Sequence, residues 1–146
     1  MQRWEAIDLI MYNILLVDDN PADVRLVIEA LKVGQLSCHI TTIENGEKAL
    51  AWLRVQAKER GAPPPDLILL DLNLPQMSGH TVLALPKADP LLQRIPVLIL
   101  TTSHFKEDER QAYQLGAAQF LIKPDTWAGY VRMVDVIGSL CAGERP

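Results

Sequence analysis

Short apolar runs alternate with longer amphipathic runs along this chain, and the alternation occurs five times. Each apolar run has the length of a β-strand, and three are almost continuous Ile, Leu and Val, which is typical of parallel strands covered on both faces. The pattern predicts an α/β fold of five strand-helix units, with the polar run HITTI at an edge of the sheet. The predicted strands are YNILLVD (12–18), HITTI (39–43), LILLD (67–71), VLILTT (97–102) and QFLIK (119–123).

Local signals place the helices between these strands. Asn20 is suited to cap a helix that starts at Pro21 and carries Asp23 in its first turn. Residues 46–61 have apolar side chains near helical spacing, and the sequence GAPPP then ends the pattern. The third helix is expected to be short or kinked, because Pro86 cannot donate a backbone hydrogen bond within it.

Length and composition limit the classes of protein. The 146 residues are enough for one folded domain, which we expect over residues 12–141, with 1–11 as an N-terminal arm or leader and 142–146 as a tail. The net charge of -4 and the scattered basic residues argue against direct nucleic-acid binding. No apolar run approaches the length of a membrane span, and no secretory signal is present, so we expect a cytoplasmic protein whose two cysteines are reduced.

Four of the five predicted strands end in polar side chains. Each of these has an ordinary structural explanation when taken alone, as a helix cap, a β-branched strand residue or a surface lysine. The carboxyl ends of parallel strands lie along one edge of a sheet, however, and doubly wound folds bind their ligands there. We therefore expect one shared site, formed by Asp18, Asp19, Asp71, Thr101, Thr102 and Lys123.

Three carboxylates in one pocket repel one another unless a cation joins them. An all-oxygen ligand set favours a hard ion, and Mg²⁺ is the first candidate because it binds through only a few protein oxygens. Such an ion, with an ammonium and a hydroxyl group opposite, can neutralise a phosphoryl group during transfer. These residue types therefore favour Asp71 as a nucleophile that accepts a phosphoryl group.

Four short motifs occur in an order and spacing that are specific as a set: VDDN (17–20), LLDLNLP (69–75), LTTS (100–103) and IKP (122–124). Through them the chain, from about residue 13 to residue 140, closely resembles the receiver domains of bacterial two-component response regulators. The resemblance implies a flavodoxin-like, doubly wound sheet with strand order 2-1-3-4-5 and five helices. It also implies that Asp71 accepts its phosphoryl group from the phosphohistidine of a sensor histidine kinase.

The resemblance further implies how the metal would be held. Asp19 would bind Mg²⁺ directly, Asp18 would bind it through water, and Asn73 would bind it through its backbone carbonyl. Asp71 would complete the ligand set, and Lys123 would pair with the phosphoryl oxygens.

A switch on phosphorylation is implied in the same way. The Thr101 hydroxyl would move to bond the phosphoryl group, with Thr102 beside it and Phe120 as the rotating aromatic partner. The peptide bond before Pro124 would be cis. Within the family, the segments NPADVRLVIEAL, DLNLP and IPVLILTTS look most like the small stand-alone regulators associated with bacterial phytochromes.

Two other classes of protein remain open. A haloacid-dehalogenase-like phosphatase also phosphorylates an aspartate in an α/β fold with Mg²⁺. That family is expected to carry a D-x-D motif on its first strand, whereas the DLN sequence here lacks the second acid. Turnover of a generic phosphate ester would distinguish the two. The other class is a receiver-like binding module that acts without phosphorylation, although no residue required for phosphorylation is missing. We expect a phosphoacceptor, with possible autodephosphorylation, rather than an enzyme.

The final helix is expected to carry a second apolar face. The segment TWAGYVRMVDVIGSLC has one apolar stripe that can cover the sheet, and Met133, Val136 and Leu140 recur beside it. A wider apolar arc needs a further partner, which could be a second copy, the kinase or the N-terminal arm. We expect a homodimer built on this helix and the strand before it, because twofold self-association is the commonest solution.

Overall fold

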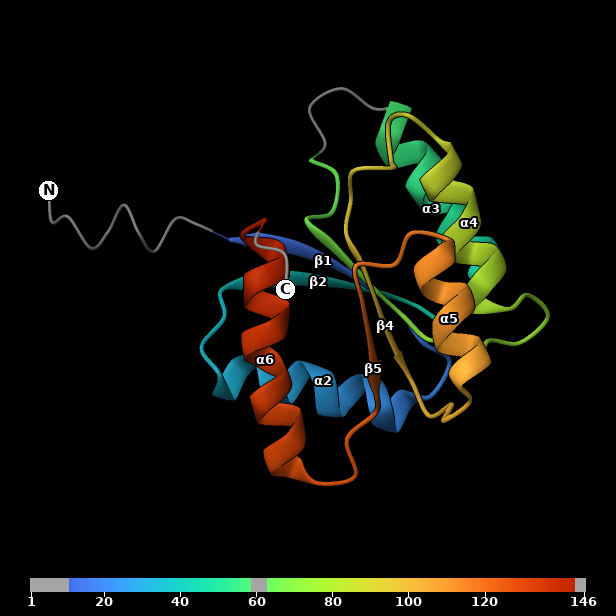
Figure 1. The fold of residues 1–146 in the computed structure, drawn as a ribbon. Coiled ribbons are helices and arrows are strands. Elements are labelled where there is room, and N and C mark those ends of the chain that lie inside the picture. Colours follow the sequence, from blue (N-terminus) through green and yellow to red (C-terminus); the bar gives the residue numbers. More distant parts are fainter. Residues whose placement is uncertain (1–10, 59–62, 144–146) are drawn as a thin grey trace, which may run out of the picture.

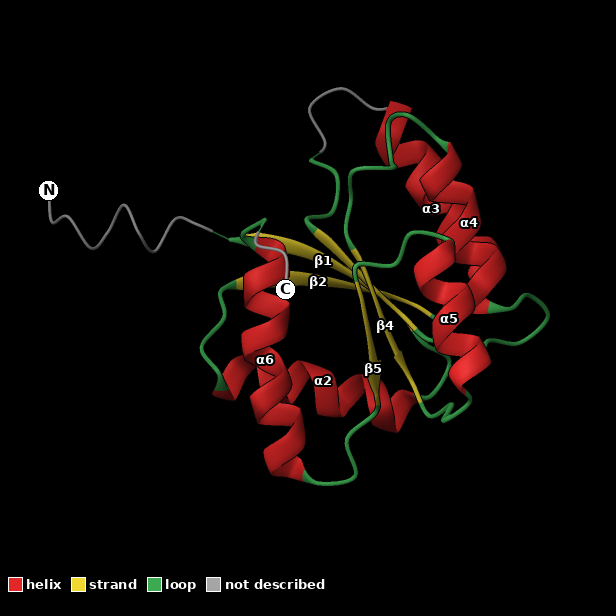
Figure 2. Cartoon of the chain, viewed as in Figure 1, coloured by secondary structure: helices red, strands yellow, loops and turns green. Residues whose placement is uncertain are grey.

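Five parallel strands form one sheet in the order β2-β1-β3-β4-β5 (Figures 1 and 2). The computed structural model describes residues 11–58 and 63–143. The predicted flavodoxin-like order is confirmed, and the polar strand β2 lies at an edge of the sheet as expected. The strands are β1 (Tyr12–Val17), β2 (Cys38–Ile43), β3 (Leu67–Leu70), β4 (Val97–Thr101) and β5 (Gln119–Ile122).

Helices cover both faces of the sheet (Figure 1). Two of them, α2 and α6, pack side by side on one face, and α3, α4 and α5 lie on the other. The helices are α2 (Pro21–Val33), α3 (Gly46–Lys58), α4 (Gly79–Ala88), α5 (Lys106–Gln114) and α6 (Trp127–Cys141).

The sheet separates two apolar cores. Successive side chains of a strand point to opposite faces, so Leu15 and Val17 enter the core under α3, α4 and α5, while Ile14 and Leu16 enter the core under α2 and α6. The β3 and β4 residues divide in the same way. A shift of one residue in register would exchange both cores, and the packing therefore fixes where each strand ends.

The predicted helix signals are present. The Asn20 side chain caps α2 by accepting hydrogen bonds from the backbone N–H groups of Ala22 and Asp23. The helix α4 has 10 residues and ends at Ala88, two residues after Pro86, so the expected short helix is confirmed. The helix predicted over 46–61 is described as far as Lys58.

The apolar arc of α6 is buried within the chain. Met133 and Leu140 are 4% and 2% exposed, and the half-buried Val136 packs against the same core. The expectation that Met133 and Leu140 lie on an uncovered dimer face is wrong, because both side chains belong to the core on the side of the sheet where α2 and α6 pack together. Trp127, at the start of the helix, is 45% exposed.

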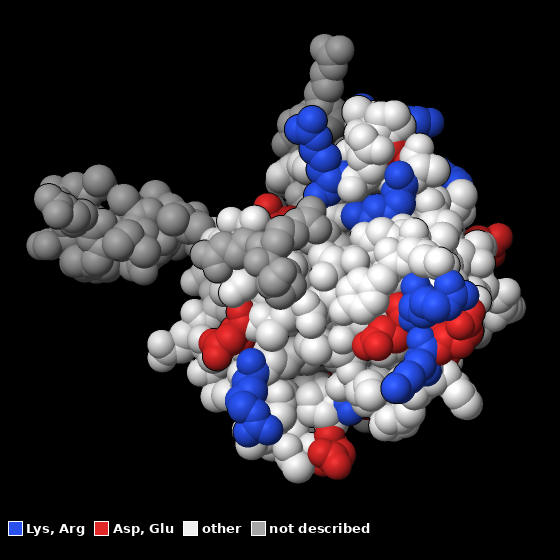
Figure 3. All heavy atoms as spheres, in the orientation of Figure 1, with Lys and Arg blue, Asp and Glu red and all other residues white. Residues whose placement is uncertain are grey.

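The predictions for the chain ends lie largely outside the described residues. These are residues 1–10 of the arm or leader and residues 144–146 of the tail. No helix within 11–58 or 63–143 is long and apolar enough to cross a membrane. On the face drawn in Figure 3, Lys and Arg side chains lie in separate groups with acidic side chains beside several of them.

The start of α4 fits closely against the backbone that follows β3. A Cβ atom on Gly79 would lie 2.6 Å from Leu72 Cα and would clash with the backbone oxygen of Asp71. The Gly79 backbone N–H also donates a hydrogen bond of 3.0 Å to the Leu72 carbonyl. This position therefore requires glycine for its lack of a side chain.

We expect Gly79→Ala to destabilise the protein by about 1–3 kcal/mol, because rigid backbone atoms would have to move. The matched control is Gly138→Ala in α6, where the nearest atom to the new Cβ is Leu36 Cδ1 at 3.7 Å. This control should stabilise the chain by about 0.5–1 kcal/mol through helix propensity. Urea unfolding of both variants checks the contrast, and equal effects would contradict it.

Candidate functional site

Two buried carboxylates lie side by side at the carboxyl edge of the sheet. The register pairs Val17 of β1 with Leu70 of β3, and Asp18 and Asp71 are the next residues of the two strands. The Asp71 backbone N–H extends the ladder by donating to the Val17 carbonyl at 3.0 Å. Both aspartates are 5% exposed. The apolar strands thus hold two acidic groups where neither is well hydrated.

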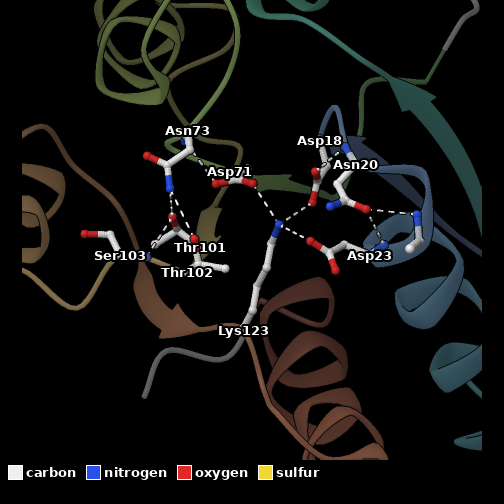
Figure 4. Close-up of polar contacts among 10 residues, drawn as sticks. Asp18, Asn20, Asp23, Asp71, Asn73, Thr101, Thr102, Ser103 and Lys123 are labelled. Atoms are coloured by element: carbon white, nitrogen blue, oxygen red, sulfur yellow. Dashed lines mark hydrogen bonds and ion pairs between the residues drawn. The ribbon is translucent and has the colours of Figure 1, made fainter.

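A single lysine holds these carboxylates together (Figure 4). Lys123 follows β5, and its backbone N–H donates to the Thr101 carbonyl at 2.8 Å. Its side chain reaches past the end of β4, and its ammonium group binds three carboxylates. The distances from Nζ are 2.9 Å to Asp18 Oδ2, 2.7 Å to Asp23 Oδ2 and 2.8 Å to Asp71 Oδ2.

Burial and ion pairing act in opposite directions on these groups. Burial disfavours the charged form of Lys123, whose side chain is 6% exposed, but its hydrogen bonds to the three carboxylates outweigh burial and hold its pKa above the ordinary value. Burial raises the pKa of Asp18 and outweighs the hydrogen bonds from Asn20 and Lys123, which lower it. The lysine therefore stays charged, while Asp18 is ionised at a cost.

Three carboxylates at this edge suit a cation. Asp18, Asp19 and Asp71 each offer one oxygen, and these oxygens lie within 4.8 Å of one another. Asp19 is exposed, so the cluster opens to solvent on its side. The donors are all oxygen atoms, as a hard divalent cation requires. The residues present therefore fit the predicted kind of metal ion.

Hydroxyl and amide groups lie on the other side of Asp71 (Figure 4). The Asn73 backbone N–H donates to Asp71 Oδ1 at 3.0 Å. The Asn73 side chain donates to the hydroxyls of Thr101 and Thr102 at 3.4 and 3.3 Å. Thr101 is fully buried and also accepts a hydrogen bond from the backbone of Ser103, whereas Thr102 is exposed.

The predicted aromatic residue lies inside the molecule. Phe120 is 7% exposed and belongs to the core under α3, α4 and α5. Its backbone N–H donates to the Tyr113 hydroxyl of α5 at 3.0 Å. Rotation of this ring stays a prediction.

The peptide bond between Lys123 and Pro124 is trans. No cis peptide bond occurs in the part of the chain that the structure describes, so the prediction of a cis bond is wrong. The trans form is the intrinsically favoured one, by about 0.5–1 kcal/mol for a bond that precedes proline.

Asp23 is the site residue that sequence reasoning missed. The sequence pattern predicts only an acidic residue in the first turn of α2, yet the Asp23 carboxylate binds Lys123, which lies 100 positions away in the sequence. A usable signal was its position four residues after Asp19. Side chains of an α-helix tilt toward its N-terminus, so an acid in the first turn of α2 points back toward the end of β1.

Comparison with known proteins agrees with this geometry. Residues 14–133 match the response regulator receiver domain family, and the chain belongs to that family. The chain is 43% identical to the response regulator Rcp1 of Synechocystis sp. over 126 residues, which cover 86% of each chain.

Two solved structures show the same similarity. One is the phosphorylated cyanobacterial phytochrome response regulator RcpA, at 38% identity and a TM-score of 0.81, covering 91% of this chain and 95% of that one. The other is the Mn²⁺-bound form of Rcp1, at 42% identity and a TM-score of 0.77, covering 88% and 92%. The predicted family and its similarity to phytochrome-associated regulators are therefore confirmed.

We expect Asp18→Asn to raise the melting temperature by about 2–6 °C in the presence of a chelator, because the amide removes an ionised group whose burial is costly. The raised pKa of Asp18 gives the sign of the pH dependence. The gain should be largest above that pKa and should vanish well below the ordinary value of 3.8, where Asp18 is protonated in both the folded and unfolded states.

Thermal melts of the two proteins from pH 7 to about pH 2.5 measure this difference. The exposed Asp135→Asn serves as the control and should show no comparable gain. A lower melting temperature for Asp18→Asn at pH 7 would mean that its carboxylate is better stabilised than burial suggests.

Proposed function

We propose that this protein is a response regulator that accepts a phosphoryl group on Asp71 from a histidine kinase, in a Mg²⁺-dependent reaction, and relays the signal by a change of conformation. The observation that carries the proposal is the position of Asp71. Its buried carboxylate belongs to a cluster that can hold a divalent cation, and it is bound by the Lys123 ammonium. Family membership supports the same function.

The chemistry follows from a carboxylate used as a nucleophile. An oxygen of Asp71 attacks phosphorus, the O–P bond forms as the P–N bond to the kinase histidine breaks, and the imidazole leaves with the electron pair of that bond. Bound Mg²⁺ would supply charge screening between the carboxylate and the phosphoryl oxygens. Asp19 would hold the ion directly, with Asp18 acting through water and Asn73 through its backbone carbonyl.

Lys123 and Thr101 would then bind the new phosphoryl oxygens. The Lys123 ammonium is already 2.8 Å from Asp71 Oδ2, so a small movement is enough. The Thr101 hydroxyl now bonds Asn73 and the backbone of Ser103, and it would have to exchange these partners. Thr101 lies in β4 beside β5, so a movement of Thr101 would also displace β5 and its buried residue Phe120. Thr102 would lie at the exposed rim of the site.

The upstream partner is proposed to be a sensor histidine kinase of the phytochrome type. The support is the similarity to RcpA, which is a cyanobacterial phytochrome response regulator. The choice of Mg²⁺ rests on the all-oxygen donor set of this chain, and Rcp1 has been solved with Mn²⁺ bound. A cytoplasmic location also stays a prediction.

We expect Asp71→Asn to abolish labelling by acetyl phosphate, because the amide keeps the shape of the side chain and loses the nucleophile. Wild-type protein should be labelled with Mg²⁺ and not with chelator. Asp135→Asn, which removes an exposed carboxylate elsewhere, should be labelled at the wild-type rate. Phosphate incorporation measured by mass spectrometry tests all three statements. Wild-type labelling of Asp71→Asn would exclude Asp71 as the acceptor.

We also propose a homodimer, now placed at β5 and the start of α6. The exposed apolar residues there are Ile122 and Trp127, each 45% exposed, and β5 is an edge strand. Light scattering at tens of micromolar should give about twice the chain mass for the wild type. Ile122→Asp should give a monomer, while Leu91→Asp, at a site 67% exposed, should not. A monomeric wild-type protein would refute the dimer.

A further inference from the structure

Lys123 has one partner that differs from the other two. Its Nζ atom lies within 2.9 Å of an oxygen of each of three carboxylates, and it donates hydrogen bonds to Asp23 and Asp71. The side chains of Asp18 and Asp71 are 2% and 5% exposed, whereas that of Asp23 is 24% exposed. The contact with Asp23 is also the shortest of the three, at 2.7 Å (Figure 4).

Asp23 is outside the candidate cation cluster. Among the described residues, the carboxylates that gather within 4.8 Å of one another are those of Asp18, Asp19 and Asp71. Two members of that cluster, Asp18 and Asp71, are also bound by Lys123. The ammonium group and a bound cation therefore draw on the same two carboxylates, and only Asp23 belongs to the lysine alone.

We infer that Asp23 is a positioning residue that holds the Lys123 ammonium beside the phosphoacceptor when a divalent cation takes Asp18 and Asp71. The inference rests on the proposed function and adds a residue to it. A buried ammonium group without ion-pair partners raises the free energy of the protein. Without Asp23, a cation that takes Asp18 and Asp71 would leave Lys123 in that unfavourable state, and cation binding would be weaker. Asp23 reduces this free-energy cost, because its ion pair with Lys123 stays intact while the cation replaces the ammonium group at the other two carboxylates.

The contact also joins distant parts of the chain. Asp23 lies in the first turn of α2, where the Asn20 side chain accepts a hydrogen bond from its backbone N–H at 3.1 Å. The cap fixes the helix start, and the helix start directs the carboxylate toward Lys123 after β5. The capped start of α2 thus positions the Asp23 carboxylate, and this position does not depend on the cation cluster.

A simpler role for Asp23 is stabilisation of α2 by a negative charge at the helix N-terminus, worth about 0.3–1 kcal/mol. A second simple role is to add negative charge near the cation. Neither role requires Lys123. The positioning role acts only through the lysine, and a double-mutant cycle separates it from both alternatives.

The experiment measures Mg²⁺ affinity by isothermal titration calorimetry. The proteins are the wild type, Asp23→Asn, Lys123→Met, the double variant, and Glu29→Gln as a control that removes an exposed carboxylate from the same helix. Asp23→Asn should weaken Mg²⁺ binding about tenfold, as expected for coupled members of one ion-pair network. In the Lys123→Met background the same substitution should change the affinity less than about twofold. Glu29→Gln should bind like the wild type.

Each outcome has a distinct meaning. Weakening that disappears with Lys123→Met supports the inference. Equal weakening in both backgrounds would show a simple charge effect and overturn it, as would wild-type affinity in Asp23→Asn. A wild-type protein that binds no Mg²⁺ would overturn the proposed function together with the inference, whereas failure of Asp23→Asn alone leaves the proposed function intact. Thermal melts in chelator confirm that each variant is folded before titration.

Discussion

One ammonium group is required to neutralise carboxylates that come from three separate parts of the chain. Lys123 binds acids at the end of β1, in the first turn of α2 and at the end of β3. Without that positive charge, the negative groups would repel one another at a largely buried place where water screens them poorly. The rest of the fold can be understood as the support that keeps these four side chains within hydrogen-bonding distance. The sheet fixes the positions of Asp18, Asp71 and Lys123 at the strand ends, and the cap of α2 fixes the position of Asp23.

The parts of the fold that follow from local pattern were predictable. The strands β1, β3 and β4 are nearly continuous apolar runs, and only burial on both faces explains such runs in a chain of this composition. From parallel strands alone it follows that their carboxyl ends share one edge. Asp18, Asp71 and Lys123 could therefore be assigned to one site from the sequence, and the structure brings them together.

The parts that depend on distant contacts were not predictable in the same way. Helical spacing shows that α6 has a wide apolar arc, but it cannot tell whether a sheet, a neighbouring helix or another molecule covers the arc. In this fold Met133 and Leu140 are core residues, in a cluster that strand residues and α2 residues share. Asp23 was missed for a similar reason, because a helix-terminal acid has a sufficient local explanation and its partner is 100 positions away.

The glycine at the start of α4 has a mechanical consequence. Gly79 has no side chain to compress, so the backbone of α4 rests directly on the backbone that carries Asp71. A displacement of the Asp71 carbonyl toward the helix would meet backbone atoms and no flexible side chain. The close contact at Gly79 therefore offers a steric connection from the edge of the sheet to α4 that is separate from the hydrogen bond between Asn73 and Thr101.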